Sequence, residues 1–184
     1  MTSMASTRNR TRRARVRARG WVPLVVVLAC APIAAARAQD IAPGKPAPEI
    51  DLPTLQGGQV KLSLLRGHPV VLSFWGTWCP PCRDEFPELV AAYRKYHEVG
   101  LEVIGVNQRD QELSIRDVQA FVEKYSVDFT VALDSRGRSR RSFRLMGLPT
   151  TVFIDSAGII RNVHTGPINA AELASGLALI VPPR

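Results

Sequence analysis

Cysteine is scarce in this chain of 184 residues, which contains only three. Cys30 lies in the N-terminal segment, so residues 39–184 contain only Cys79 and Cys82. Two cysteines three positions apart exclude a disulfide framework of the kind that stabilises small secreted domains. They also argue against a structural zinc site, because there is no second cysteine pair to complete four ligands. The 146 residues of the downstream segment are enough for one domain with its own hydrophobic core.

Acidic residues are absent from the first 39 positions, and the first one is Asp40. Eight arginines in the first 37 positions therefore account for the whole formal charge of +8, because the remaining 16 basic residues equal the 16 acidic ones. The high pI belongs to the N-terminal segment and not to the domain. The domain's composition thus gives no support for nucleic-acid binding, and we expect no nucleic-acid partner. The hydrophobic content of 46% argues against wholesale disorder.

The N-terminal segment has the three parts of an export signal. Seven arginines between Arg8 and Arg19 come first, 17 uncharged residues at 20–36 follow, and Ala36-Arg37-Ala38 supplies a small-x-small site. A basic arm for nucleic acid is the weaker reading, because such an arm needs no apolar run behind it. Residues 1–38 are therefore predicted to be an export signal or membrane anchor, and residues 39–184 the folded domain.

Three outcomes of export remain open. Cleavage after Ala38 is favoured by the small-residue site. Residues 20–36 would just reach across a membrane if they were kept as an anchor. Lipidation at Cys30 fits less well, because Leu28, directly before the small residue Ala29, matches a lipidation motif poorly. Each outcome places the domain outside the cytoplasm, in the periplasm, either free or anchored to the cytoplasmic membrane, where disulfides persist.

Hydrophobic periodicity predicts alternating strands and helices along the rest of the chain. An extended arm at 41–53 and a turn at 56–59 come first. Apolar runs predict strands, and i, i+3, i+4 spacing predicts helices. The strands are expected at 60–62, 69–75, 101–106, 129–133, 150–154 and 159–164, and the helices at 80–97, 115–125, 138–143 and 170–180. This order indicates an α/β fold with a partly parallel sheet covered on both faces and an antiparallel pair at its end.

The segment Trp78-Cys79-Pro80-Pro81-Cys82 lies where a predicted buried strand passes into a helix. Cysteines at i and i+3 of a first helical turn lie on one face, within reach of a disulfide. The helix N-terminus favours a thiolate over a thiol. Prolines are tolerated in the first turn, and here they stiffen the loop. Redox chemistry is the reading that fits best.

Two structural readings of the cysteine pair are weaker. A disulfide that closes a loop of four residues contributes only about 2 kcal/mol by the loop-entropy argument, so it is a poor staple. A metal site lacks ligands, since His68, His97 and His164 are isolated in the sequence. We therefore expect no metal site and no cofactor besides a redox-active Cys79–Cys82 disulfide.

The segment from Phe74 to Cys82, Phe-Trp-Gly-Thr-Trp-Cys-Pro-Pro-Cys, resembles the active-site segment of exported thioredoxin-like proteins of the TlpA, ResA and CcmG kind. The resemblance covers roughly residues 41–180. It extends to Gly44-Lys45-Pro46-Ala47-Pro48, Gly147-Leu148-Pro149-Thr150-Thr151 and Ile154-Asp155-Ser156-Ala157-Gly158. It implies a thioredoxin fold, in which helices flank a central mixed sheet. It also implies a short N-terminal strand extension, and a helical insert after the strand that follows the CxxC helix.

The resemblance also implies roles for individual residues. Cys79 would be the nucleophile and Cys82 the resolving thiol, so we expect Cys79 to face solvent and Cys82 to turn inward. Pro149 matches the cis-proline of this fold, and the loop of Leu148, Pro149 and Thr150 would pair with an extended substrate. A plain strand-entry proline is the alternative for Pro149. Trp78 is expected to shield the sulfurs, with an ordinary core position as its alternative.

One departure from ordinary thioredoxins concerns the proton acceptor. Those proteins carry a buried aspartate on the strand before the motif, where this chain has Ser73. Some ResA-like members place a carboxylate in the insert after the next strand, and the matching residue here is Asp110. Asp110 is therefore a candidate base for Cys82, although a solvated loop acid is the somewhat favoured reading.

A run of like charge lies near the predicted cis-proline loop. Arg136, Arg138, Arg140, Arg141 and Arg144 place five cations in nine residues with no acid among them. A solvated face is the ordinary reading of such a run. Docking of an acidic partner is the alternative.

The function expected from the sequence is protein thiol–disulfide exchange, as a reductase in cytochrome c maturation or in general disulfide reduction. The partners would be protein thiols or disulfides, apocytochrome c among them, and a membrane electron donor; we expect a monomer. A thiol peroxidase is the first alternative, but its cysteine needs a threonine three positions ahead, where this chain has Gly76. A non-catalytic, redox-dependent binding protein or metal chaperone is the second.

Overall fold

The computed structural model describes residues 41–182, so the predictions for residues 1–38, Cys30 included, lie outside the described residues. The mixed sheet of the thioredoxin fold, with the order β5-β4-β3-β6-β7, forms its centre. β4 is parallel to β3 and β5, whereas β6 is antiparallel to both β3 and β7. The strands are β1 (Asp51–Pro53), β2 (Gln59–Lys61), β3 (Val70–Trp75), β4 (Glu102–Asn107), β5 (Thr130–Leu133), β6 (Thr150–Ile154) and β7 (Ile160–Thr165).

Four α-helices and three short 3₁₀ helices connect the strands. The α-helices are α1 (Pro80–Tyr96), α2 (Ile115–Lys124), α3 (Arg138–Ser142) and α4 (Ala170–Leu177). The 3₁₀ helices are η1 (Leu62–Leu65), η2 (His97–Val99) and η3 (Arg109–Gln111). Within residues 41–182, no helix has the length and apolar character needed to cross a membrane.

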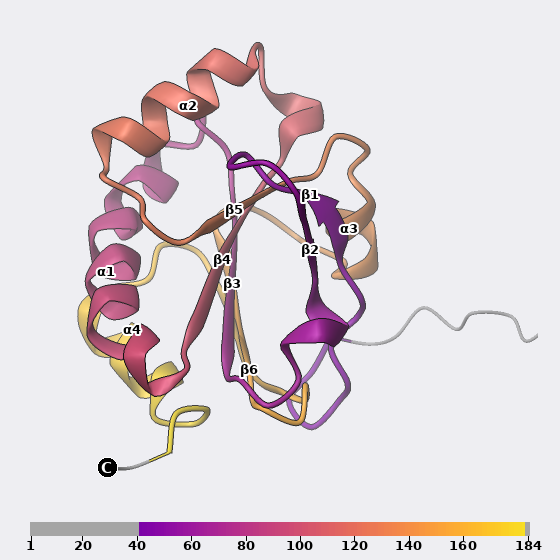
Figure 1. Cartoon of the computed structure of the whole chain (residues 1–184), viewed down its shortest axis with the longest axis vertical. Helices are drawn as coiled ribbons and strands as arrows, with labels where there is room; N and C mark the ends of the chain where they lie inside the picture. Colours follow the sequence, from indigo (N-terminus) through magenta and orange to yellow (C-terminus); the bar gives the residue numbers. More distant parts are fainter. Residues whose placement is uncertain (1–40, 183–184) are drawn as a thin grey trace, which may run out of the picture. The chain divides into compact units, whose positions relative to one another are not determined.

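The central strand β3 is buried on both faces, as its continuous apolar run predicts. Val71, Ser73 and Trp75 point to the face covered by α1, α2 and α4, where they meet the apolar cluster that contains Phe86, Phe121 and Leu173. Val70, Leu72 and Phe74 point to the other face, which α3 and the β1–β2 hairpin cover through Phe143 and Leu52. Figure 1 shows α1 and α4 on one side of the sheet and α3 on the other.

The predicted elements are confirmed except at their ends. The N-terminal extension is a two-stranded antiparallel sheet that bridges to β5 through Thr54 and Ala132. The helical insert after β4 is α2, whose first turn is fixed by a capping box between Ser114 and Asp117. The last helix ends at Leu177 and not at 180. Ile180 still packs into the core, but its N–H donates to Leu177 in a tighter turn, so apolar spacing overestimated the helix.

Candidate active site

The two cysteines lie at the start of α1, directly after the carboxyl end of β3. Cys79 is the N-cap of the helix, and Pro80 and Pro81 occupy its first two positions. Cys79 and Cys82 form a disulfide with their Cα atoms 5.3 Å apart. The N–H of Cys79 donates to the carbonyl of Gly76 at 3.1 Å, which closes the turn into the helix. The predicted strand-to-helix placement is thus confirmed.

The prolines reduce the number of free N–H groups at the N-terminus of α1. A helix start normally leaves four N–H groups without partners inside the helix. Here two of the four positions are prolines, which have no N–H, and the N–H of Cys79 already donates to Gly76. Only the N–H of Cys82 is left in this first set. An N-cap side chain can accept from the second or third helical amide, but the side chain of Cys79 makes no such hydrogen bond in the disulfide form.

Both cysteines are buried, which corrects one expectation. Cys82 is fully buried, as predicted, but Cys79 is only 3% exposed instead of facing solvent. Both belong to the apolar cluster beneath α1, which includes Phe86. A substrate must therefore reach Cys79 through a small opening.

The loop before the cysteines is held by a buried carboxylate that the sequence analysis did not single out. Glu112, which follows η3, accepts a hydrogen bond of 2.7 Å from the N–H of Thr77 and another from its hydroxyl. The side-chain amide of Asn107 at the end of β4 donates to the same carboxylate at 2.8 Å. Arg83 on α1 donates to the carbonyl of Thr77 at 2.8 Å. Thr77 is thus held directly by Glu112 and Arg83, and Asn107 in turn holds Glu112.

Trp78 is not a core residue, because 47% of it is exposed. Its indole lies over Gly76, where a Cβ atom would come within 2.8 Å of the ring. Glycine at this position therefore lets the ring fold back onto the loop. Its shielding of the sulfurs remains a prediction.

A second buried carboxyl group lies on the cysteine helix itself. Glu85, one helical turn after Cys82, is only 1% exposed, and the hydroxyl of Ser73 donates to it at 2.8 Å. Burial raises the pKa of Glu85 to about 7, although hydrogen bonds from Ser73 and from the backbone of Ile168 oppose the shift. A carboxyl group with this pKa can exchange protons near neutral pH. The sequence carried a signal for it, since Glu85 falls three positions after Cys82, on the face of the helix that packs inward.

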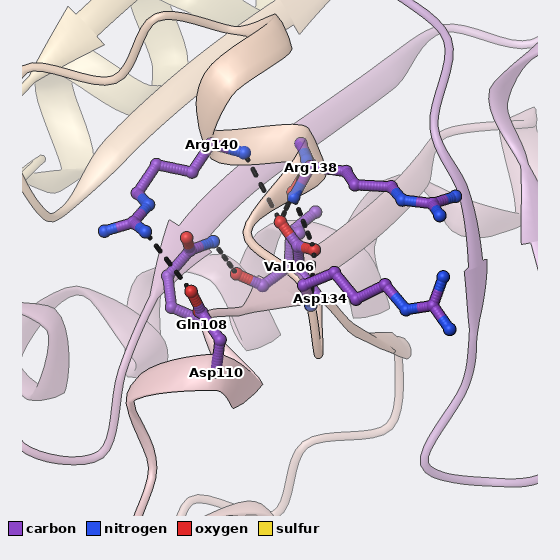
Figure 2. Close-up of polar contacts among 8 residues, drawn as sticks. Val106, Gln108, Asp110, Asp134, Arg138 and Arg140 are labelled. Carbon is purple, nitrogen blue, oxygen red and sulfur yellow. Dashed lines mark hydrogen bonds and ion pairs between the residues drawn. The ribbon is translucent and has the colours of Figure 1, made fainter.

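Asp110 has a different set of partners from those expected of a base for Cys82. Its carboxylate forms an ion pair with Arg140 at 3.2 Å, and its N–H donates to the carbonyl of Asp134 at 3.2 Å. Figure 2 shows the guanidinium of Arg140 directed at this carboxylate. These contacts join η3 to the segment before α3. The role of Asp110 as a base remains a prediction, with no described contact to Cys82 behind it.

The peptide bond between Leu148 and Pro149 is cis, as the resemblance implied. Thr150 starts β6 and pairs with Phe74 on β3, so the loop lies at the same end of the sheet as the cysteines. The hydroxyl of Thr150 donates to the carbonyl of Gly147 at 2.8 Å. A cleft of about 350 Å³ lies between this loop and Trp78. Its lining residues are Trp78, Gln111, Arg140, Leu145, Met146, Gly147 and Leu148.

The buried carboxylate of Asp134 holds part of the backbone of the basic run at 136–144. This carboxylate is fully buried and accepts hydrogen bonds from the N–H groups of Arg138 at 2.9 Å and Arg140 at 3.4 Å, at the start of α3. In Figure 2 the side chain of Arg138 extends away from Asp110, whereas that of Arg140 turns toward it. The run is therefore not one uniform face. Neither of its two readings is decided by these contacts.

No group of three or more His, Cys, Asp or Glu side chains suited to a metal ion occurs in the part of the chain that the structure describes. The three histidines have other neighbours. His68 contacts the carbonyl of Gly100, His97 that of Tyr93 and His164 that of Pro167.

Comparison with known proteins gives a consistent family. The AhpC/TSA family matches residues 43–163, which is more than half of the chain. The thiol-disulfide oxidoreductase ResA of Halalkalibacterium halodurans is 37% identical over 139 residues, which cover 76% of this chain and 77% of the relative. The thioredoxin-like protein YneN of Bacillus subtilis is 35% identical over 136 residues, covering 74% of this chain and 79% of that protein.

Solved structures agree with these relatives. A protein from Chlorobium tepidum assigned as thiol:disulfide interchange protein DsbE has a TM-score of 0.67 and 34% identity, with 74% of this chain and 95% of that one covered. A thioredoxin-family thiol:disulfide interchange protein from Chlorobium tepidum TLS has a TM-score of 0.68 and 25% identity, with 78% and 99% covered. With a disulfide at the end of a central strand and relatives of this kind, the chain belongs to the AhpC/TSA family and, within it, to the thioredoxin-fold thiol–disulfide oxidoreductases of the ResA and DsbE kind.

Proposed function

We propose that this oxidoreductase is an extracytoplasmic reductase of protein disulfides, with Cys79 and Cys82 as its only redox group. The observation that carries the proposal is the position of Cys79 as the N-cap of α1, with its sulfur bonded to that of a fully buried Cys82. A cap position lowers the pKa of a thiol, because the helix dipole and a free amide stabilise the thiolate. Cys82 is not at the cap and is fully buried, so the two thiols are unequal.

The exchange proceeds in two displacements. The thiolate of Cys79 attacks one sulfur of the substrate disulfide, forms a mixed disulfide, and releases the other substrate sulfur as a thiolate. The thiolate of Cys82 then attacks the sulfur of Cys79, which releases the second substrate sulfur and closes the Cys79–Cys82 disulfide. The substrate gains two electrons and two protons, and the protein loses them. A membrane electron donor would then reduce the disulfide for the next cycle.

Glu85 is the group that we assign to the proton of Cys82. It lies one turn further along α1, it is buried, and the pKa of about 7 lets it accept a proton near neutral pH. Ser73, at the position where ordinary thioredoxins carry their acid, holds this carboxyl group through a hydrogen bond. The proposed proton acceptor is thus on helix α1, whereas in ordinary thioredoxins it is on the strand before the motif.

Protein thiols and disulfides are the proposed substrates, with apocytochrome c cysteines as one class. The cis-proline loop supports this, because Leu148 is half-buried beside a cleft that an extended segment could enter. Main-chain pairing with such a loop recognises a polypeptide without demanding one sequence. We propose that the protein works as a monomer.

An exported location rests on the basic start, apolar run and small-residue site of residues 1–38. If the segment is cleaved after Ala38, the exported protein begins at Gln39. The intact mass of material from the periplasm tests this. A mass that includes residues 20–36, or lipid on Cys30, would replace cleavage with anchoring.

The thiol peroxidase alternative is disfavoured by one position. A threonine three residues before Cys79 would replace Gly76, and a side chain there would collide with the indole of Trp78 at 2.8 Å. The experiment compares turnover of two substrates by the reduced protein. We expect catalysed reduction of insulin disulfides and no consumption of hydrogen peroxide above that of a Cys79→Ser variant.

The same assay separates the binding-protein and metal-chaperone alternatives. A protein that only binds would show no turnover of insulin. Turnover of peroxide without turnover of insulin would establish the peroxidase instead.

A further inference from the structure

Three of the six large apolar residues that are exposed in residues 41–182 line the two hollows that share Trp78, the residue before Cys79. They are Trp78 at 47%, Leu113 at 98% and Met146 at 92% exposed. Met146 and Trp78 line the cleft next to the cis-proline loop. Leu113 and Trp78 line a second, larger hollow of about 670 Å³ between α2 and the start of α1. We call this hollow the α2-side groove; its main residues are Trp78, Arg83, Leu113, Phe121, Lys124 and Tyr125.

The exposure of Leu113 is not the result of a loose loop. Its neighbour Glu112 is tied to Thr77, and its other neighbour Ser114 is the N-cap of α2 in a capping box with Asp117. A hydrophobic residue directly before an N-cap often packs against the fourth helical residue, here Val118. That contact is not made, since Val118 is fully buried and Leu113 is almost fully exposed. The backbone thus holds an apolar side chain in solvent at the rim of the groove.

The acidic and basic side chains of the groove differ in the partners that the protein gives them. Its two carboxylates already accept hydrogen bonds from the protein, Glu112 from Thr77 and Asn107, and Asp117 from the N–H and hydroxyl of Ser114. Its two cations have no carboxylate partner among the described residues. Arg83 donates to a backbone carbonyl, and Lys124 lies 5.3 Å from the centre of the Tyr125 ring. A carboxylate on a bound polypeptide could therefore pair with either cation, next to the aromatic and aliphatic side chains that line the groove.

We propose that the α2-side groove binds the substrate polypeptide through a large apolar side chain and a neighbouring carboxylate, close to the reacting cysteine. This inference rests on the proposed function and names the class of segment that the reductase prefers. Trp78 and Gln111 line both the groove and the cleft beside the cis-proline loop, so the two hollows meet at the tryptophan. A segment that crosses Trp78 can occupy both while its cysteine reacts with Cys79.

The test uses synthetic peptides that carry one cysteine as a mixed disulfide with glutathione. Each peptide carries one residue pair, Phe-Glu, Ser-Glu or Phe-Lys, and the peptides are otherwise identical. Each pair is tested in two positions, before the cysteine and after it. Rates with the reduced protein are measured by stopped-flow fluorescence and divided by each variant's rate with oxidised glutathione, which has no large apolar side chain. We expect the fastest reaction with a Phe-Glu peptide.

Two variants probe the groove and two serve as matched controls. Leu113→Asn should slow the Phe-Glu peptide about tenfold, the effect of losing one apolar anchor, and leave the Ser-Glu peptide within about twofold. Lys124→Gln should reduce the preference for Phe-Glu over Phe-Lys, and that preference should also shrink as salt is added. The controls are Leu64→Asn and Lys45→Gln. Leu64 is 77% exposed on η1, which precedes β3 and so lies at the end of that strand away from the cysteines. Both controls should behave as the wild type.

Several results would overturn the proposal. Equal rates for all peptides would do so, and so would an equal loss in Leu64→Asn and Leu113→Asn. A shift from dimer to monomer in Leu113→Asn, seen by sedimentation, would show that a second copy of the chain occupies the groove instead. Failure to reduce any peptide or oxidised glutathione would reject the proposed function itself, which is a different outcome from reduction without preference.

Discussion

Ser73 on β3 donates a hydrogen bond of 2.8 Å to the carboxyl group of Glu85 on α1, inside the core and one helical turn from Cys82. The strand supplies a hydroxyl and the helix supplies the acid. In this way a titratable group stays beside the resolving cysteine although the strand carries none. Because the hydrogen bonds to Glu85 only partly offset the cost of burying its charge, the ionised form is poorly stabilised.

The buried acid predicts a dependence of stability on pH. The pKa of Glu85 is raised from 4.5 to about 7 by burial, so between these values the folded state binds a proton that the unfolded state has lost. The free energy of unfolding therefore falls as pH rises through this window, by up to about 3 kcal/mol for this group. Glu85→Gln should flatten this part of the curve and be the more stable protein at pH 8. Urea unfolding at pH 5 and pH 8 measures it, and an unchanged slope would contradict it.

The two candidate bases can be tested against each other. We expect the rate at which the mixed disulfide resolves to show an inflection near pH 7 that disappears in Glu85→Gln, with a loss of roughly 100-fold, as for removal of a general base. Asp110→Asn should keep the inflection, because Asp110 pairs with Arg140. Single-turnover kinetics over a pH range give both results. Loss of the inflection in Asp110→Asn alone would establish Asp110 as the base that the sequence suggested.

The unequal thiols predict which single mutant captures substrates. Cys82→Ser should accumulate a protein bound through Cys79, because nothing is left to attack the mixed disulfide. Cys79→Ser should capture little, because the remaining thiol is fully buried and lacks the cap position. Non-reducing gels of a periplasmic extract, with iodoacetamide rates for each variant, measure this. A faster reaction of Cys82 would reverse the assigned roles.

A packing prediction concerns the contact between α4 and the sheet. A Cβ atom on Gly176 would lie 2.3 Å from the ring of Phe153 on β6, so the helix can approach the strand only with glycine there. Gly176→Ala should destabilise the protein by about 1–2 kcal/mol, since overpacking outweighs the better helix propensity of alanine. Ser175→Ala on the exposed side of the same helix is the control and should cost less. Urea midpoints decide, and a stabilised Gly176→Ala protein would refute the close contact.

The order of the elements, the strand-to-helix position of Cys79 and Cys82, and the family could all be predicted from the sequence. These are local features, because apolar periodicity, prolines in a first turn and a cysteine pair act within a few neighbouring residues. The same local character explains why the end of the last helix was predicted wrongly. The helix expected to reach 180 ends at Leu177, since a buried Ile180 continues the apolar spacing while its N–H donates to a carbonyl only three positions back.

The side chains near the disulfide come together only through the packing of the strands and helices. Glu85 and Ser73 are 12 positions apart and meet because β3 and α1 pack face to face. Glu112 and Thr77 are 35 positions apart and meet because β3 and β4 are parallel neighbours whose ends lie side by side. Asp110 pairs with Arg140 for the same reason, because β4 and β5 are parallel neighbours and the segments that follow them lie close together. Hydrogen bonds and ion pairs act over a few ångströms, so they follow the placement of strands in the sheet and not the spacing of residues along the chain.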